Sequence, residues 1–266
     1  MDVGPLIEAL FPLLVVWLMM SLRFMGFAMV FPWFTWLNLP LTIRFAFAAA
    51  MGLPFAYVVS QTQADILQGL EATALGLLAV KEILIGAGIG LLAGVPIWAA
   101  QSGGEIIDTY RGSSAGNLFD PSLTTETSEL GVVFTAMALA VLTWSGGVQA
   151  LVWAIYGSIN IWPIFELTPT LELDQAPAVA LILKQFVTNA VAIAAVLLTC
   201  MFAADLALGL ISRSVQQFQV FELSLNIKNM VYAFLMPVFA LPILSLVTDQ
   251  LRPLSNLLEL LESLIQ

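Results

Sequence analysis

Residues 83–104 read ILIGAGIGLLAGVPIWAAQSGG and contain no charged side chain. An α-helix needs about 20 mostly apolar residues to cross the hydrocarbon core of a membrane. Apolar and polar residues do not alternate along the run, as they would in a strand of a transmembrane barrel. The stretch therefore predicts a long, membrane-spanning helix.

The rest of the chain has the same character. Of its 266 residues, 60% are hydrophobic and only 10% are charged, and its mean hydropathy is +0.97. Soluble domains usually carry about 25% charged residues, so the composition indicates an all-α integral membrane protein. Other charge-free runs together with turn signals predict about six long, kinked helices, near residues 5–31, 41–60, 66–101, 130–158, 177–212 and 228–250.

Several classes of function are excluded or disfavoured by composition. The net charge is −10, without a basic stripe, so nucleic acid is not an expected partner. There is no histidine and only one cysteine, Cys200, so a histidine-ligated metal, a histidine-based triad and an intramolecular disulfide are all excluded. No nucleotide-binding loop is found, and the N-terminus lacks the basic region of a cleavable signal peptide. We expect no cofactor, no metal and no enzymatic activity.

Two charged residues interrupt the longest predicted helix. A helix over residues 66–101 would measure about 54 Å, well beyond a hydrocarbon core of about 30 Å. Lys81 and Glu82 lie inside it. Neighbouring residues on a helix point about 100° apart, so we expect Lys81 and Glu82 not to pair directly with each other, and each to need another partner or water. Either these charges lie in a protein interior, or the helix begins near Lys81 at the membrane interface.

Three glycines follow these charges at a regular spacing. Gly86, Gly90 and Gly94 lie four residues apart and so share one helix face. Small residues at this spacing allow a second helix backbone to approach closely. The pattern predicts tight helix packing, within the chain or between chains.

Charged residues also lie at the end of the predicted fifth helix and after it. Asp205 and Arg213 fall near its end, and Lys228 is predicted to open the last helix, where it could reach the membrane interface. Two interpretations of Asp205 remain open. It is either a proton-relay carboxylate or an acid held by structural partners, and we favour the second.

A polar, glycine-rich segment at residues 101–129 separates two apolar helices. Its glycines are expected to prevent one regular helix from running through it. Irregular backbone at membrane depth is tolerated only inside protein or around water, so the segment is either a solvated connector or a re-entrant loop that plugs a pathway. The residues assigned to this loop are Gly103, Gly104, Glu105, Asp108, Tyr110, Arg111, Gly112, Gly116, Phe119, Asp120 and Pro121.

Motifs spread over essentially the whole length resemble one family in order and spacing. They are KEILIGAGIG at 81–90, SGGEIIDTYRG at 102–112, LFDPSLTTETSELG at 118–131, WPIF at 162–165, DLALGLISR at 205–213 and FELSLNIK at 221–228. Together they resemble the T subunit of the type III secretion export apparatus, whose flagellar counterpart is FliR. The injectisome branch is the more similar one. Tyr110 and Asn226 depart from the family pattern, which commonly has glutamine and proline there.

The resemblance implies a role in protein secretion at the bacterial inner membrane. Residues 1–165 would be similar to an R subunit, including the plug loop, and residues 166–251 to the helical hairpin of an S subunit. One copy would assemble with five R and four S subunits, near the U subunit and the basal body of the secretion system. Unfolded secreted proteins would pass through this gate, which the loop would close. Residues 252–266 are predicted to form an amphipathic tail.

Two alternatives come from other classes of function. A stand-alone secondary transporter or ion channel could use Asp205, Lys81 or Glu82 for a coupled ion, but no clear inverted repeat is visible. An intramembrane enzyme would need a nucleophile–base pair or a metal cluster, and the chain offers only scattered carboxylates.

Overall fold

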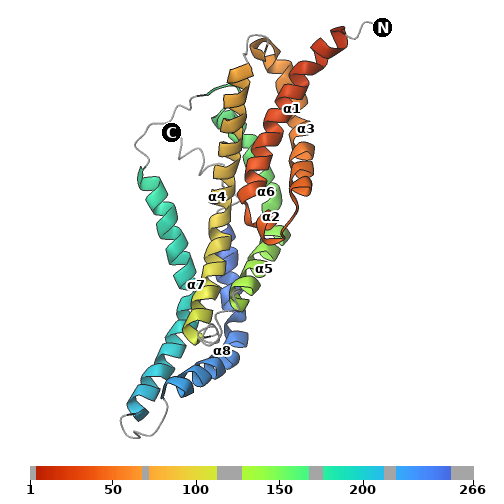
Figure 1. Ribbon diagram of the computed structural model, residues 1–266. Helices are drawn as coiled ribbons and strands as arrows, with labels where there is room; N and C mark the ends of the chain where they lie inside the picture. The colour runs from red at the N-terminus through yellow and green to blue at the C-terminus, as the bar shows by residue number, and fades with distance from the viewer. Residues whose placement is uncertain (1–3, 68–71, 113–127, 168–175, 213–219, 253–266) are drawn as a thin grey trace, which may run out of the picture. The chain divides into compact units, whose positions relative to one another are not determined.

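The computed structural model of the chain describes residues 4–67, 72–112, 128–167, 176–212 and 220–252 (Figure 1). These residues form α-helices and no β-strand, which confirms the predicted all-α fold. The helices are α1 (Gly4–Val30), α2 (Pro32–Trp36), α3 (Leu41–Leu67), α4 (Ala72–Arg111), α5 (Glu129–Trp144), α6 (Gly147–Ile161), α7 (Ala176–Ser212) and α8 (Val220–Leu251).

Four of the described helices are long and apolar enough to cross a membrane. The candidate spans are Leu10–Val30, Thr73–Arg111, Ala180–Ser212 and Leu223–Leu251. A fifth is possible if α5 and α6 form one broken span, and the apolar part of α3, Leu41–Ala56, is shorter. The prediction of a multi-pass membrane protein is confirmed.

The single helix predicted at residues 130–158 is divided in two. α5 ends at Trp144 and α6 begins at Gly147. Between them, Gly146 has a φ of 77°, a left-handed conformation that favours glycine and interrupts a right-handed helix. The length and apolar character of residues 130–158 favoured one continuous helix. The Ser-Gly-Gly sequence at 145–147, inside this run, was a sign of the break that the prediction did not use.

The chain divides into two compact units. Unit 1 comprises Met1–Val95, Gly146–Val179 and Leu254–Gln266, and unit 2 comprises Pro96–Ser145 and Ala180–Pro253. The helix α4 passes from one unit into the other at Pro96. The predicted division at residue 165 separates a part similar to an R subunit from a part similar to an S subunit. These two units do not test it, so it stays a prediction. The predicted tail at 252–266 lies outside the described residues, apart from Arg252.

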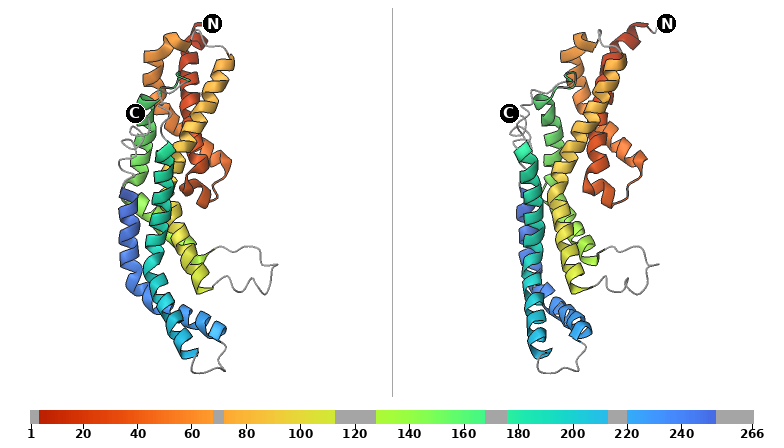
Figure 2. Two further views of the ribbon diagram at one scale, coloured as in Figure 1. Left: turned by 90° about the vertical axis from the view of Figure 1, so that its left-hand side faces the viewer. Right: turned by 60° about the vertical axis from the view of Figure 1, so that its left-hand side comes forward.

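In unit 1, α1 and α3 lie side by side, with the short helix α2 between them in sequence (Figures 1 and 2). Trp17 Nε1 in α1 donates to the Ala49 carbonyl in α3 at 2.8 Å. A Cβ on Gly52 would lie 2.6 Å from Ser21 Oγ, so only glycine permits this approach. From α6, Tyr156 Oη donates to the Met51 carbonyl at 2.5 Å. These contacts bind α1, α3 and α6 into one unit.

In unit 2, α7 and α8 form an antiparallel hairpin (Figure 2). Gln250 Nε2 near the end of α8 donates to the Asn189 carbonyl in α7 at 3.4 Å. At the other end of the hairpin, Lys228 Nζ lies 3.5 Å from Asp205 Oδ2. α5 packs against α8. The last part of α4 completes this unit.

The prediction that α4 ends near residue 101 was wrong. The helix continues through Gly103 and Gly104 to Arg111. Both glycines are places of close packing rather than breaks, because a Cβ on Gly104 would lie 2.6 Å from the Leu130 carbonyl oxygen of α5. The helix stops at Gly112, whose φ of 80° is typical of the glycine that follows a helix end.

Candidate functional site

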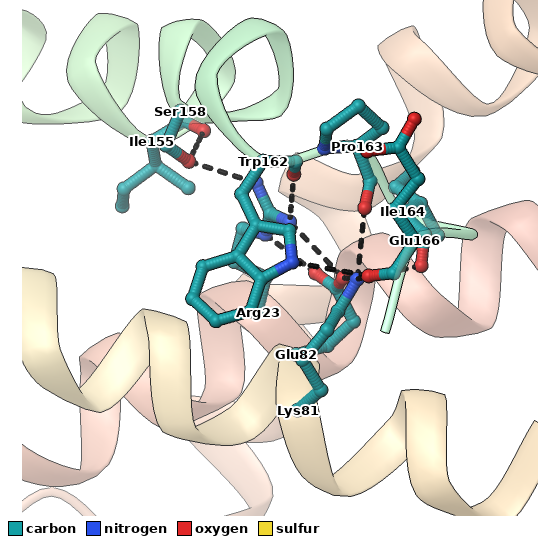
Figure 3. Close-up of polar contacts among 9 residues, drawn as sticks. All are labelled: Arg23, Lys81, Glu82, Ile155, Ser158, Trp162, Pro163, Ile164 and Glu166. Carbon is teal, nitrogen blue, oxygen red and sulfur yellow. Dashed lines mark hydrogen bonds and ion pairs between the residues drawn. The ribbon is translucent and has the colours of Figure 1, made fainter. Parts of the chain in front are cut away.

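Three charged side chains meet in the interior of unit 1 (Figure 3). Arg23 of α1 binds Glu82 of α4 through two contacts, Nε to Oε2 at 2.5 Å and Nη2 to Oε1 at 3.0 Å. Lys81 Nζ lies 2.9 Å from Glu82 Oε1. The exposed fractions are 0% for Arg23, 0% for Glu82 and 7% for Lys81. We call these three residues the buried charge cluster.

The remaining donors of the cluster bind the end of α6 and the residues after it. Arg23 Nη1 donates to Ser158 Oγ at 2.9 Å, and Nη2 donates to the Trp162 carbonyl at 3.0 Å. Lys81 Nζ donates to three further carbonyl oxygens, those of Pro163, Ile164 and Glu166, at 2.8, 2.7 and 3.1 Å.

Removing one member of a buried ion pair costs about 3–5 kcal/mol, because the other charge is left unpaired. The cluster therefore fixes α1, α4 and the segment after α6 to one another. Both cations and the carboxylate are fully engaged, so no member of it is an open binding group.

Of the two interpretations of Lys81 and Glu82, the structure supports charges in a protein interior, and it contradicts the expectation that these two side chains do not pair with each other. The helix does not begin near Lys81, since α4 starts at Ala72 and both side chains are buried. The two neighbours also pair with each other directly. Both side chains are long and bend toward the same polar interior, where Arg23 and the carbonyls lie.

Arg23 was missed as a functional residue, although the sequence carried a signal for it. It is the one charge that separates the charge-free runs 9–22 and 24–43, and it lies inside a predicted apolar helix. A charge at such a position requires a partner. That the partner is Glu82 could not be read from the sequence, because the pairing depends on how α1 packs on α4.

The glycines of α4 lie where α1 comes close. A Cβ on Gly90 would lie 2.9 Å from the Phe27 carbonyl oxygen, and a Cβ on Gly86 would collide with the Arg23 carbonyl. Gly26 of α1 allows the same close approach from the other helix, since a Cβ there would collide with the Ile83 carbonyl of α4. Gly94 is buried. This close approach brings Arg23 within reach of Glu82.

In unit 2, Asp108 joins the end of α4 to the start of α5. Its Oδ2 accepts hydrogen bonds from Ser128 Oγ at 2.6 Å and from the Leu130 backbone N–H at 2.9 Å. Arg111 Nε donates to Oδ1 at 2.8 Å, and its Nη2 lies 3.4 Å from Glu129 Oε2. Asp108 is 3% exposed. A carboxylate at a helix N-terminus is also favoured by the helix dipole. We call this group the Asp108 clamp.

A second polar group ties α4 to the α7–α8 hairpin. Asp205 has a partner on each oxygen, because Tyr110 Oη donates to Oδ2 at 3.0 Å and Ser224 Oγ donates to Oδ1 at 2.6 Å. Lys228 forms an ion pair with the same carboxylate at 3.5 Å. The prediction that Lys228 opens the last helix was wrong, since α8 begins at Val220.

Two cations stack on aromatic rings across the same contact. Lys228 Nζ of α8 lies 4.7 Å from the centroid of the Tyr110 ring, and Arg111 Cζ of α4 lies 4.6 Å from the centroid of the Tyr232 ring. Each helix thus supplies one tyrosine and one cation. Contacts of this kind contribute about 0.5–2 kcal/mol each. We call these four residues the α4–α8 seam.

The other residues singled out in the sequence fall into two sets. Glu105 accepts a hydrogen bond from Gln101 Nε2 at 2.8 Å and borders an open groove of about 890 Å³. The groove is lined by Ser102, Glu105, Ile106, Thr109, Tyr110, Leu198, Thr199 and Phe202. Five predicted site residues lie outside the described part of the chain: Gly116, Phe119, Asp120, Pro121 and Arg213.

Comparison with known proteins identifies the family. Residues 14–253 match the family described as bacterial export proteins, family 1. The chain is 32% identical to Yop proteins translocation protein T of Yersinia pestis over 200 residues, which cover 73% of this chain and 76% of the relative. It is 29% identical to flagellar biosynthetic protein FliR of Bacillus subtilis over 240 residues, covering 90% and 89%. Secretion system apparatus protein SsaT of Salmonella typhimurium is 30% identical over 182 residues, covering 68% and 69%.

The residues that match the family model are largely the same residues that form the candidate membrane spans. The matched residues include every described helix that is apolar enough to cross a membrane, except the first residues of Leu10–Val30. The chain therefore belongs to bacterial export proteins family 1, the family of the type III secretion T subunit and flagellar FliR, and is a multi-pass inner-membrane component of an export apparatus.

Proposed function

We propose that the chain closes and gates the inner-membrane channel through which a type III secretion injectisome exports unfolded proteins. The observation that carries the proposal is the Asp108 clamp. It holds the end of α4 directly against the start of α5, at 2.9 Å from the Leu130 N–H to Asp108 Oδ2. The clamp thus holds together the two described helix ends on either side of residues 113–127, as the proposed plug role requires.

The partners in this proposal are R and S subunits, with one copy of this chain to five R and four S copies, and further contacts to the U subunit and the basal body. Support comes from the apolar surface of the hairpin. Leu206 and Leu210 of α7 are 55% and 65% exposed, and Phe234 and Leu241 of α8 are 74% and 75% exposed. An apolar surface of this extent suits lipid or neighbouring apolar helices.

The proposal also assigns the chain to the injectisome branch of the family rather than to the flagellar branch. The 32% identity to the Yersinia pestis translocation protein supports it, beside 29% to FliR of Bacillus subtilis. The chain would have no enzymatic activity of its own, and the energy for export would come from other components.

Ion conductance of the assembled gate tests the proposal. Deleting residues 113–117 is expected to make membranes that contain the assembled complex leak ions, because the segment that closes the channel is shortened. A deletion variant that assembles and still does not leak ions would contradict the proposed plug role. Native mass spectrometry of the same preparation establishes that the deletion variant has assembled.

The alternative of a stand-alone transporter has less support. Such a protein would need an intramembrane acid that can exchange an ion. Glu82 is bound by Arg23 and Lys81, and Asp205 is bound by Tyr110, Ser224 and Lys228. Ion flux through the purified chain alone, reconstituted in lipid vesicles, would favour the transporter instead.

A further inference from the structure

The groove between α4 and α7 in unit 2 has the size of a binding site. Its volume is about 890 Å³, within the range of about 300–1,000 Å³ that is usual for such sites. A Cβ on Gly103 of α4 would lie 2.9 Å from Ile193 Cγ2 of α7, and further along Tyr110 Oη donates to Asp205 Oδ2 at 3.0 Å. The α7 residues that line the groove lie between Ile193 and Asp205 in sequence. The two helices are therefore held together on both sides of the groove, which is preformed.

The two walls of the groove differ in polarity. Three of the lining residues on α4 are polar and share one helix face: Ser102, Glu105 and Thr109. The wall on α7 contains Leu198 and Phe202, together with Thr199. The Thr199 hydroxyl donates to the Ala195 carbonyl of its own helix at 2.7 Å, so this wall presents mainly apolar surface. An occupant of the groove therefore meets a polar face on one side and an apolar face on the other.

Glu105 brings to the groove a negative charge that no basic residue in the described part of the chain neutralises. Its partly buried side chain accepts one hydrogen bond, from Gln101 Nε2 at 2.8 Å. The described arginines and lysines that form ion pairs do so with other acids. A charged group on a membrane-crossing helix usually has an opposite charge as its partner or lies against water. Beside the apolar wall of α7, a cation brought by the occupant would be the matching partner.

An apolar helix that carries one lysine or arginine suits both walls. Phe202, Leu206 and Leu210 of α7 are 54%, 55% and 65% exposed. Their four-residue spacing makes an apolar stripe about 12 Å long that continues from the groove. A helix along this stripe buries apolar side chains against α7 and directs its basic side chain to Glu105. The acyl chain of a lipid would instead cover the Glu105 carboxylate without pairing with it, which costs free energy.

We propose that the groove between α4 and α7 binds a helix of a neighbouring apolar subunit, and that Glu105 selects this helix by pairing with a lysine or arginine on it. The inference rests on the proposed function for its source of partner subunits, and it assigns one contact with them to this groove. Glu105 is thus a specificity-determining residue of the assembly, because a helix without a cation leaves its carboxylate unpaired.

A photo-crosslinking side chain in the groove tests the occupant. p-Benzoylphenylalanine is placed at Phe202, in the complex purified after co-expression with R and S subunits. Mass spectrometry is expected to find a cross-link to a partner helix with a lysine or arginine within two turns of the cross-linked residue. Phe234, exposed on α8 and outside the groove, is the matched position and is expected to give a different cross-linked peptide. Cross-links from Phe202 only to lipid, to a second copy of this chain or to a segment without a basic residue would overturn the proposal.

Substitutions of Glu105 test the charge. Glu105→Gln keeps the shape of the side chain and is expected to lower the yield of the Phe202 cross-link by about tenfold, since a partly buried ion pair lies between exposed and buried ones in strength. Glu105→Lys should lower it further, because attraction becomes repulsion. Exchange of the identified partner cation for glutamate is expected to restore the yield with Glu105→Lys. Asp249→Asn removes an acid of α8 that lies outside the groove, and should change the yield by less than about twofold. Unchanged yields in both Glu105 variants would overturn the pairing.

Native mass spectrometry of the same preparations separates this inference from the proposed function. A complex with R and S subunits in which Phe202 reaches no basic helix would overturn the groove assignment and leave the function standing. A chain that does not assemble with R and S contradicts the proposed function, and the inference falls with it. Thermal unfolding of each variant chain alone shows whether it folds, and if Glu105→Lys does not, Glu105→Gln decides.

Discussion

Arg23 and Glu82, 59 residues apart in sequence, form a two-contact ion pair at 2.5 and 3.0 Å, and neither side chain is exposed. Lys81 completes the cluster and brings a second positive charge to the same carboxylate. This one carboxylate therefore balances two buried cations that come from α1 and α4. The stability of unit 1 depends on it more than on either cation alone.

We expect Glu82→Gln to destabilise the protein by about 3–5 kcal/mol, because it leaves Arg23 and Lys81 buried without a negative charge. Thermal unfolding of the purified protein in detergent measures the loss. Glu105→Gln is the matched control, since Glu105 lies on the same helix, is only partly buried and is bound by Gln101. Equal unfolding temperatures for the two variants would contradict the importance assigned to the cluster.

Lys81→Met should have a smaller global effect than Glu82→Gln, because Glu82 keeps both of its contacts to Arg23. Its effect should be local instead, since three carbonyl oxygens between residues 163 and 166 lose their donor. Hydrogen exchange over residues 162–167 is expected to quicken, while exchange in α3 stays unchanged. Lys184→Met, at an exposed lysine of α7, is expected to leave the exchange of residues 162–167 as it is.

Gly86→Ala is expected to cost about 1–3 kcal/mol, because its new methyl group would collide with the Arg23 carbonyl and push α1 away from α4. Gly88→Ala places the same methyl group on the same helix, two residues away, where nothing lies within 4 Å. That control should be neutral or stabilising by up to about 1 kcal/mol, because alanine favours helix more than glycine does. The thermal unfolding of both variants in detergent checks this, and a Gly86→Ala as stable as Gly88→Ala would refute the packing argument.

Ser128→Ala is expected to loosen the first turn of α5 by about 0.5–2 kcal/mol, the usual cost of losing a helix N-cap. The serine accepts a hydrogen bond from the Gly131 N–H at 2.9 Å and donates one to Asp108. Hydrogen exchange in the first turn of α5 should therefore quicken. Ser145→Ala, at the other end of α5, removes a hydroxyl that donates to the Leu142 carbonyl and should leave that first turn protected.

Much of the fold follows from the sequence because membrane helices depend on local composition. Long charge-free runs predicted the helices, and the spacing of Gly86 and Gly90 predicted that a backbone would approach there. In the structure that backbone is α1. The break at Gly146 and the continuation of α4 through Gly103 and Gly104 were not predicted, because the packing partner decides whether a glycine breaks a helix or permits a contact.

Which charged residues pair with each other was harder to predict from the sequence than the positions of the helices. Lys81, Glu82 and Asp205 were recognised as charges that need partners, but Arg23 was overlooked and Tyr232 gave no signal. Partners such as Arg23 and Glu82 come from helices far apart in the chain, so their contact depends on tertiary packing. The seam is a similar case, since Tyr110 stood out only as a departure from the family pattern, and its contacts with Asp205 and Lys228 became visible in the structure.

Native mass spectrometry tests the central claim most directly, on the chain purified gently after co-expression with the R and S subunits of its own secretion system. The account predicts one complex in which a single copy of this chain accompanies five R and four S subunits. A chain that stays alone while R and S are present and folded would contradict its assignment as the closing subunit of an export gate.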